Sequence, residues 1–249
     1  MTAAQDFKDH FSAGSGAYER YRPGYPPALY AWLAGQSPGR RLAVDVATGN
    51  GQAAVGLADY FDAVIACDAS AAQLAAARAH PRVEYRRDAA EALSLPAQSA
   101  DLVVAAQAAH WFDWSAFVAE ARRVLRPGGL LALWSYGNFR ATPAIERLIA
   151  DFSRDVVGPC WPRERRHVEE GYRELVPPLP AVVPPPFEMR ADWDCESALG
   201  YLGTWSAVQR YRARRGSDPV ALIAKPLAAA WGSGRRPLAW PLVLRAARA

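Results

Sequence analysis

Short apolar runs alternate with longer segments of helical periodicity between residues 42 and 135. Most of these runs are rich in alanine, valine, isoleucine and leucine and contain no glycine or proline, which is typical of strands buried on both faces of a parallel sheet. The alternation predicts βαβ units. Strands are expected at residues 42–47, 63–67, 100–107 and 130–135, with a weaker one at 83–86.

Capping residues mark the ends of the helices between these strands. Ser70 is placed to begin one helix and Pro81 to stop it, while Asp113 or Ser115 begins another that ends before the sequence Pro127-Gly128-Gly129. The helices are predicted at residues 52–60, 71–79 and 116–125.

The pattern changes after Gly137. A proline-rich stretch at residues 177–186 cannot form a helix or a central strand, because proline donates no backbone hydrogen bond. We expect an insertion over the sheet edge here. Pro241 favours an edge position or a strand start for the last strand. The later elements are predicted as helices at 146–155, 198–208 and 220–231 and strands at 187–193 and 240–246.

These elements predict an α/β fold in a single domain, with a Rossmann-like, mostly parallel sheet and helices on both faces. The 249 residues, 51% of them hydrophobic, are enough for one large core. The domain is expected to contain an N-terminal cofactor-covering segment, a cofactor-binding core, a lid or substrate insertion, and a C-terminal part that completes the sheet. Their bounds are 1–40, 41–137, 138–186 and 187–249.

Charge and cysteine content exclude several classes of function. The net charge of +4 is mildly basic, and the arginine clusters at 163–166 and 210–215 are interrupted, so we interpret them as solvated surface and expect no nucleic-acid partner. The three cysteines form no CxxC pair and indicate neither a disulfide framework nor a zinc site, which fits a reducing cytoplasm. No export signal and no membrane-spanning run is visible in the sequence.

A glycine loop, Asp45-x-Ala47-x-Gly49-x-Gly51, follows the first predicted strand and leads into a helix. A doubly wound sheet binds nucleotides at this place. Gly49 and Gly51 permit a tight turn and a close approach to a ligand, and the helix N-terminus offers free N–H groups. The loop alone is equally consistent with a simple strand-to-helix turn.

Two acids follow the next strands at the same edge of the predicted sheet. Asp68 comes after strand 63–67 and Asp88 after strand 83–86. A carboxylate at the first position can accept both ribose hydroxyls, and one at the second can accept an adenine amine. Either acid alone is typical of a helix N-cap. Three aligned strand ends together predict a nucleotide-type cofactor site.

The loop also discriminates between cofactors. A pyrophosphate ligand prefers a third glycine, where this chain has Ala54, and Asp45 beside the turn would repel phosphates. The same acid suits the ammonium and sulfonium groups of S-adenosylmethionine, which is therefore the expected cofactor. A nicotinamide-dependent oxidoreductase and a non-catalytic S-adenosylmethionine-binding protein remain alternatives.

These residues resemble the motifs of class I S-adenosylmethionine-dependent methyltransferases, and the whole chain is similar to the trans-aconitate methyltransferase-like family of small-molecule methyltransferases. The resemblance implies a seven-stranded sheet whose last hairpin is antiparallel. Ala47 departs from the glycine most common there, which is tolerable if that position has a negative φ, so we do not take it as loss of binding. The matching segments are 11–12, 18–23, 25–26, 44–52, 109–113 (AHWFD), 125–129 (LRPGG), 133–137 (LWSYG) and 201–206 (YLGTWS).

The resemblance also implies which residues contact the cofactor. Gly49 and Gly51 would contact its aminoacyl part, Asp68 the ribose, and Asp88 with Ala89 the adenine. The N-terminal segment would lie over the cofactor, with Arg22 paired to its carboxylate, and Gln107 would border the reacting centre. The full set is Tyr18, Arg22, Asp45, Ala47, Gly49, Gly51, Asp68, Ala69, Asp88, Ala89 and Gln107.

The expected reaction is an in-line methyl transfer to a small molecule, in which the enzyme positions the acceptor and excludes water. A carboxylate acceptor, which the resemblance suggests, needs no base. A hydroxyl, thiol or amine would need one, and His110 is then the catalytic candidate, although a packing role on its loop is an alternative. We predict O-methylation by a monomer or homodimer.

Aromatic residues of the second half are expected to wall the acceptor pocket, because such walls suit a small, partly apolar acceptor. Arg165 is placed to face an anionic acceptor, although its charge run is more typical of a solvated face. The predicted pocket residues are Trp111, Tyr136, Trp161, Tyr201, Trp205 and Gln209.

Overall fold

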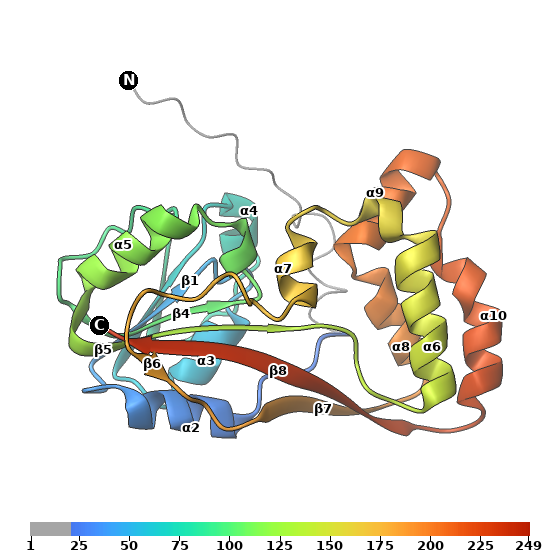
Figure 1. Cartoon of the computed structure of the whole chain (residues 1–249), viewed down its shortest axis with the longest axis horizontal. Coiled ribbons are helices and arrows are strands. Elements are labelled where there is room, and N and C mark those ends of the chain that lie inside the picture. Colours follow the sequence, from blue (N-terminus) through green and yellow to red (C-terminus); the bar gives the residue numbers. More distant parts are fainter. Residues whose placement is uncertain (1–20) are drawn as a thin grey trace.

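The computed structural model describes residues 21–249, which form a mostly parallel sheet of eight strands with helices on both faces (Figure 1). The strand order is β3-β2-β1-β4-β5-β8-β6, and β7 pairs with β8. β1 to β5 run parallel, whereas β8 is antiparallel to β5, β6 and β7. The strands are β1 Leu42–Val46, β2 Ala63–Cys67, β3 Val83–Arg86, β4 Ala100–Ala106, β5 Leu125–Tyr136, β6 Ala181–Val182, β7 Phe187–Trp193 and β8 Arg236–Arg248.

This architecture confirms the predicted α/β fold and its antiparallel last hairpin, but the sheet has eight strands and not seven. The additional strand, β6, is two residues long and lies inside the proline-rich stretch. It pairs only with Ala246 and Ala247 at the sheet edge. Prolines at 180 and 184 bound it, and because they donate no backbone hydrogen bond they keep it short.

β8 corrects the expectation of an edge strand around Pro241. Residues 242–248 pair with β5 and residues 236–242 pair with β7, so β8 lies inside the sheet. Pro241 stands where β8 is paired with β7 on one side and has left the ladder with β5 on the other. Proline is tolerated at such a position because one side of the strand needs no ladder hydrogen bond.

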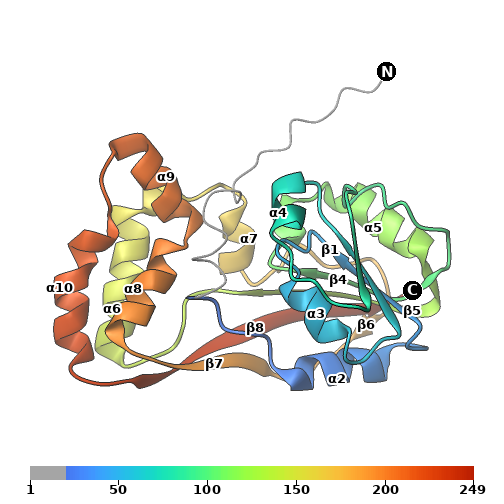
Figure 2. The same ribbon diagram turned by 180° about the vertical axis from the view of Figure 1, so that it is seen from behind.

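Helices cover the two faces of the sheet through separate apolar clusters. α5 lies over one face, and α2 and α3 over the other (Figures 1 and 2). Alternation along β1 produces this division, since Val44 packs with the α5 side and Ala43 with the α2 and α3 side. The helices are α2 Pro27–Gln36, α3 Gln52–Leu57, α4 Ala71–Ala75, α5 Trp114–Val124, α6 Pro143–Asp151, α7 Arg165–Glu169, α8 Cys195–Gly203, α9 Ser206–Arg215 and α10 Val220–Trp231.

The caps agree with the sequence pattern better than the helix lengths do. Ser70 caps α4 by accepting from the Gln73 N–H, and Asp113, rather than Ser115, caps α5. α4 ends at Ala75, short of the predicted residue 79. The chain leaves the helix there because the N–H of Arg78 is taken by the carbonyl of Asn50 in the glycine loop.

A separate group of helices lies beyond the ends of β4 and β5. α6, α8, α9 and α10 form this group, and α7 lies between it and the sheet (Figure 1). The predicted helix 198–208 is two helices, α8 and α9. Side chains take the last carbonyls of α8, since the Thr204 hydroxyl donates to the Tyr201 carbonyl at 2.7 Å and the Gln209 amide donates to the Gly203 carbonyl at 2.7 Å.

The segment after α6 is also more broken than predicted. α6 begins at Pro143, and a single π-helical turn, η2 (Phe152–Val156), continues it. Two short 3-10 turns are also present. η3 (Gly158–Cys160) follows η2, and η1 (Ala109–Trp111) follows β4. These turns position residues of the site.

Candidate functional site

The carboxyl ends of β1, β2 and β4 meet at one edge of the sheet. Asp45, near the end of β1, is the most deeply buried acid at this edge. Its side chain is fully buried. Oδ2 accepts a hydrogen bond of 2.5 Å from the Thr48 hydroxyl, whereas Oδ1 has no hydrogen-bond partner among residues 21–249. Burial, the largest cause, raises the pKa of Asp45 to about 7, against the opposing hydrogen bond from Thr48. The site therefore contains a carboxyl group whose charge is not compensated by the chain.

The glycine loop has the backbone geometry of a close ligand cradle. Gly49 and Gly51 have φ of 59° and 82°, and a Cβ on Gly51 would overlap the hydroxyl of Tyr85. Ala47 has φ 54°, so the condition of a negative φ is not met. The cause lies in the neighbouring strand, because the Thr48 N–H donates to the Cys67 carbonyl and bends the chain as it leaves β1. A left-handed alanine costs about 1–2 kcal/mol.

Asp68 joins the end of β2 to this loop. Oδ2 accepts the Gly49 N–H at 2.9 Å, and Oδ1 accepts the Ser70 N–H at 2.8 Å. Each carboxylate oxygen has a further lone pair, so the predicted contact with ribose hydroxyls remains chemically possible. Ala69, next in the chain, is half-buried and its carbonyl accepts from Arg87.

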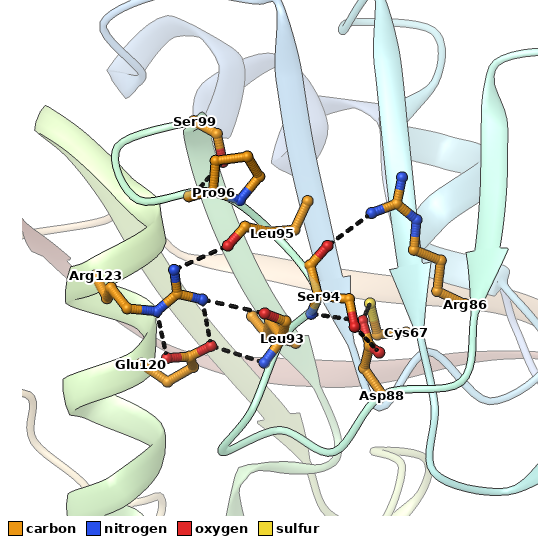
Figure 3. Close-up of polar contacts among 10 residues, drawn as sticks. All are labelled: Cys67, Arg86, Asp88, Leu93, Ser94, Leu95, Pro96, Ser99, Glu120 and Arg123. Carbon is orange, nitrogen blue, oxygen red and sulfur yellow. Dashed lines mark hydrogen bonds and ion pairs between the residues drawn. The ribbon is translucent and has the colours of Figure 1, made fainter.

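Asp88 is held mainly by its own loop (Figure 3). Its carboxylate accepts the Ser94 N–H at 3.0 Å and the Ser94 hydroxyl at 2.8 Å, and the Cys67 thiol donates to it at 3.6 Å. Arg123 fixes the next turn by donating to the carbonyls of Leu93 and Leu95. The loop after β3 is thus ordered around Asp88, and Ala89 beside it is exposed.

Gln107 follows β4 and has a left-handed backbone conformation. Its φ is 56°, its N–H donates to the Trp134 carbonyl, and its side-chain amide donates to the Tyr136 carbonyl at 2.9 Å. Oε1 is buried and has no hydrogen-bond partner in the described part of the chain. Gln107 therefore offers a free acceptor between β4 and β5.

A small cavity of about 80 Å³ opens beside Gln107, between the sheet and the helical group. This volume is that of roughly three water molecules, or of the reacting end of a small molecule. Five of the six predicted pocket residues line it, and Gln209 does not. The lining residues are Arg22, Gln107, His110, Trp111, Tyr136, Gly137, Trp161, Pro162, Arg165, Val168, Tyr201, Thr204, Trp205 and Ser206. A larger groove of about 750 Å³ on β7 and β8 contains none of the predicted site residues.

Two arginines converge on the cavity. Arg22 donates to the Tyr136 hydroxyl at 2.9 Å and to the Thr204 hydroxyl at 3.2 Å, and its guanidinium lies 4.9 Å from the centre of the Tyr201 ring. Arg165 is largely buried and stacks 4.5 Å from the centre of the Trp161 ring. Burial, the largest cause, lowers the pKa of Arg165, and Arg22 adds to this effect. Arg165 is therefore not part of a solvated face.

His110 lies on η1 at the edge of the cavity. Its Nδ1 is 3.0 Å from the Tyr172 hydroxyl, and its ring packs against Trp111 at 4.8 Å between centroids. Burial, followed by the charges of Arg165 and His167, lowers the pKa of His110 to about 3. The imidazole is consequently neutral at physiological pH.

The structure brings together most residues that the sequence analysis selected. Tyr18 lies outside the described residues. Tyr172 and Thr204 were missed as site residues: Thr204 belongs to the YLGTWS segment, which was a usable signal, whereas nothing in the sequence links Tyr172 to His110, 62 positions away. Gln209 serves the end of α8 instead of the cavity.

The residues at the sheet edge fit S-adenosylmethionine. The unpartnered Oδ1 of Asp45 suits an ammonium group, and at Gly49 a Cβ would meet, within residues 21–249, only the Gln73 side chain, at 3.7 Å, so the loop backbone there is open to a ligand. Among the described residues, no cation offsets the charge of Asp45, so its carboxylate would repel a pyrophosphate. Fold and site together define a Rossmann-like protein that binds a nucleoside cofactor carrying positive charge.

Comparison with known proteins identifies the family. Residues 44–133 match a family model described as a methyltransferase domain. A protein named as a methyltransferase in Dictyostelium discoideum is 31% identical over 229 residues, which cover 90% of this chain and 87% of that protein. An uncharacterised methyltransferase of Mycobacterium tuberculosis is 38% identical over 135 residues, 53% of this chain and 55% of that protein.

A solved structure supports the same conclusion. It is named as a type II methyltransferase from Anaeromyxobacter dehalogenans, is 46% identical, covers 92% of this chain and 98% of its own, and has a TM-score of 0.84. The chain belongs to the methyltransferase family and is an S-adenosylmethionine-dependent methyltransferase of class I. This result decides against a nicotinamide-dependent oxidoreductase. The finer assignment to the trans-aconitate methyltransferase-like group stays a prediction.

Within residues 21–249, none of the helices has the length and apolar character required to cross a bilayer.

Proposed function

We propose that the protein methylates a carboxylate oxygen of a small-molecule acceptor. The observation that carries the proposal is the pair of guanidinium groups, Arg22 and Arg165, at one small cavity. No aspartate or glutamate is among the described residues that line it. A cavity that concentrates positive charge in this way favours an anionic group.

The surroundings of Arg165 support this preference. Its ion pair with Glu169 is long, at 3.6 Å, and its Nε has no hydrogen-bond partner in the described part of the chain. A buried cation without a close counter-ion is costly, and a bound carboxylate would relieve that cost. Guanidinium groups also match the two oxygens of a carboxylate in geometry.

The chain supplies positioning and a dry cavity for the reaction. When bound, S-adenosylmethionine supplies a methyl group on a positively charged sulfur, which keeps the electron pair of the broken C–S bond as the acceptor oxygen forms the new bond. Arg165 would hold an acceptor carboxylate together with Arg22, which we now assign to the acceptor and not to the carboxylate of the cofactor; such an acceptor arrives ionised and needs no base. Trp111, Trp161 and Trp205 exclude water. Exclusion of water favours a reaction in which opposite charges neutralise each other.

A product analysis tests the proposal. The protein is incubated with methyl-labelled S-adenosylmethionine and a panel of small mono-, di- and tricarboxylates, with matched alcohols, amines and thiols. We expect label in an alkali-labile product, because an ester releases methanol in base while an ether or methylamine does not. Label only in alkali-stable products would overturn the carboxylate assignment.

Arginine variants connect that product to the cavity. Arg165→Gln should raise the acceptor KM about tenfold or more, because a hydrogen bond to a charged group is worth about 1.5–3 kcal/mol. The affinity for S-adenosylmethionine should stay the same. Arg163→Gln is the matched control, since Arg163 is exposed and does not line the cavity. Equal kinetics for the two variants would contradict the proposed role of Arg165.

A further inference from the structure

The backbone around Tyr172 holds its side chain in contact with His110. Tyr172 follows α7, is 0% exposed and has φ 53°, a strained conformation for a tyrosine. Its N–H donates to the His167 carbonyl at 2.7 Å, which holds the residue in place. The hydroxyl of Tyr172 then lies 3.0 Å from Nδ1 of His110. Nε2, on the other side of the imidazole ring, is the nitrogen left for the cavity that His110 lines.

Hydrogen-bond accounting determines the direction of this contact. Within residues 21–249, Nδ1 of His110 is the one hydrogen-bond partner of the Tyr172 hydroxyl, which is fully buried. Burial raises the pKa of Tyr172, so the hydroxyl keeps its proton. If the hydroxyl only accepted from an Nδ1–H, its own buried proton would have no acceptor within hydrogen-bond distance, so the hydroxyl donates its O–H to Nδ1.

We propose that Tyr172 donates to Nδ1 of His110 and thereby fixes the neutral imidazole with its proton on Nε2, which makes His110 a hydrogen-bond donor to the acceptor and not a base. Tyr172 is on this account a positioning residue. The part that concerns the acceptor rests on the proposed carboxylate methylation, whereas the tautomer does not.

The charges around His110 are consistent with a neutral donor. Arg165 and His167 face it from α7, and burial together with these two groups keeps its pKa far below neutrality. A base whose conjugate acid is so strong accepts protons poorly. A neutral Nε2–H can bind a carboxylate oxygen beside Arg22 and Arg165 without burying a third positive charge.

Nuclear magnetic resonance decides the tautomer without any ligand. Long-range ¹H–¹⁵N correlation spectra of labelled protein distinguish a protonated ring nitrogen from an unprotonated one, and His110→Gln assigns the signals among the four histidines. We expect Nδ1 to be unprotonated and Nε2 protonated. A protonated Nδ1 in the wild type would overturn the proposal, and this spectrum suffices even if a Tyr172 variant does not fold.

Two variants locate the cause. Tyr172→Phe keeps the ring but removes the hydroxyl, so we expect a mixture of tautomers. Ser135→Ala is the control, because the Ser135 hydroxyl also adjoins Tyr172 and would have to approach it as the proton acceptor if the hydrogen bond ran the other way. The tautomer should be unchanged in Ser135→Ala. A change there, or none in Tyr172→Phe, would contradict the role of Tyr172.

Kinetics test the donor role with the carboxylate acceptor identified by product analysis. Tyr172→Phe should lower kcat/KM for that acceptor about five- to tenfold, the effect of one misdirected hydrogen bond, with unchanged affinity for S-adenosylmethionine. At saturating S-adenosylmethionine, which removes the effect of Asp45 ionisation on cofactor binding, the wild-type rate should be flat between pH 6 and 8, and a rate that follows a histidine titration would show a base instead. Absence of turnover with every carboxylate refutes the proposed function and the donor role, while the spectra still decide the tautomer.

Discussion

Two fully buried aspartates on neighbouring parallel strands, Asp45 and Asp101, have opposite environments. Asp101 is the second residue of β4. Its Oδ2 accepts the N–H groups of Arg41 at 2.9 Å and Leu42 at 3.0 Å, and its Oδ1 forms an ion pair with Arg126 at 2.9 Å. Asp45, the penultimate residue of β1, has one hydrogen bond, from Thr48, and an unpartnered Oδ1 within the described chain. The same side chain is compensated at one end of the sheet and left uncompensated at the other.

The difference separates a structural end of the sheet from a binding end. Backbone strain follows the same division, because Ala47, Gln107 and Tyr172, all at the site, are three of the four described non-glycine residues with positive φ. Such conformations cost about 1–3 kcal/mol each and persist where function requires them. The residues whose conformation or charge destabilises the folded chain are thus concentrated at the site, where a bound ligand would offset that cost.

The largest expected effect is a difference in folding stability between variants of the two aspartates. Asp101→Asn should lower the free energy of unfolding by about 3–5 kcal/mol, because it leaves Arg126 without its counter-ion in a largely buried site. Asp45→Asn should be at least as stable as the wild type at pH 8. Urea unfolding of both variants measures this, and equal destabilisation by the two substitutions would remove the distinction.

The sign of the Asp45 effect follows from its raised pKa. Between about pH 4 and pH 7 the unfolded chain ionises this carboxyl while the folded chain keeps it protonated, so wild-type stability falls as the pH rises through this range. A shift of about three units corresponds to roughly 4 kcal/mol. Asp45→Asn should abolish that fall, whereas an unchanged pH profile would show that Asp45 is not its source.

Asp68→Ala should weaken the binding of S-adenosylmethionine by about 1–3 kcal/mol, the value of a charge-assisted hydrogen bond. The variant loses the acceptor for the Gly49 N–H as well as the predicted ribose contact. Binding of adenosine, which keeps the ribose and lacks the methionine part, should weaken alongside it. Calorimetry measures both ligands, and unchanged affinity for both would refute the ribose assignment.

The smallest expected effect concerns the loop backbone. Ala47→Gly should raise the free energy of unfolding by up to about 1 kcal/mol, because glycine adopts φ 54° without strain and offsets its greater entropy in the unfolded chain. Ala31→Gly in the exposed face of α2 is the matched control and should lower stability by about 1 kcal/mol. Destabilisation of equal size at both positions would mean that Ala47 is not strained.

The sequence predicted those features that depend on local pattern. Four of the five parallel strands were found because they are short apolar runs between helical segments, and the caps of α4 and α5 because Ser70 and Asp113 precede helical periodicity. Alignment of parallel strands then placed Asp45, Asp68 and Asp88 at one edge.

Features that depend on distant contacts were missed. β6 forms because Ala246 and Ala247 of β8 offer it backbone hydrogen-bond partners. Ala47 takes a positive φ because the next residue, Thr48, donates its N–H to the Cys67 carbonyl in β2. Arg165 belongs to a charge run in which Arg163 and Arg166 are exposed, and its packing on Trp161 next to the cavity buries it. No pattern in the neighbouring residues encodes such contacts.

Calorimetric titration with S-adenosylmethionine at pH 5.5 and pH 7, for the wild type and Asp45→Asn, tests the central claim that Asp45 is left uncompensated for a cationic cofactor. The ammonium of the cofactor stays protonated in this range, since α-amino groups titrate near pH 8. For the wild type we predict roughly tenfold tighter binding at pH 7, with proton release, because binding requires the ionised carboxyl. Asp45→Asn should bind more weakly and without pH dependence. Wild-type affinity that is equal at both pH values and retained by Asp45→Asn would contradict the account.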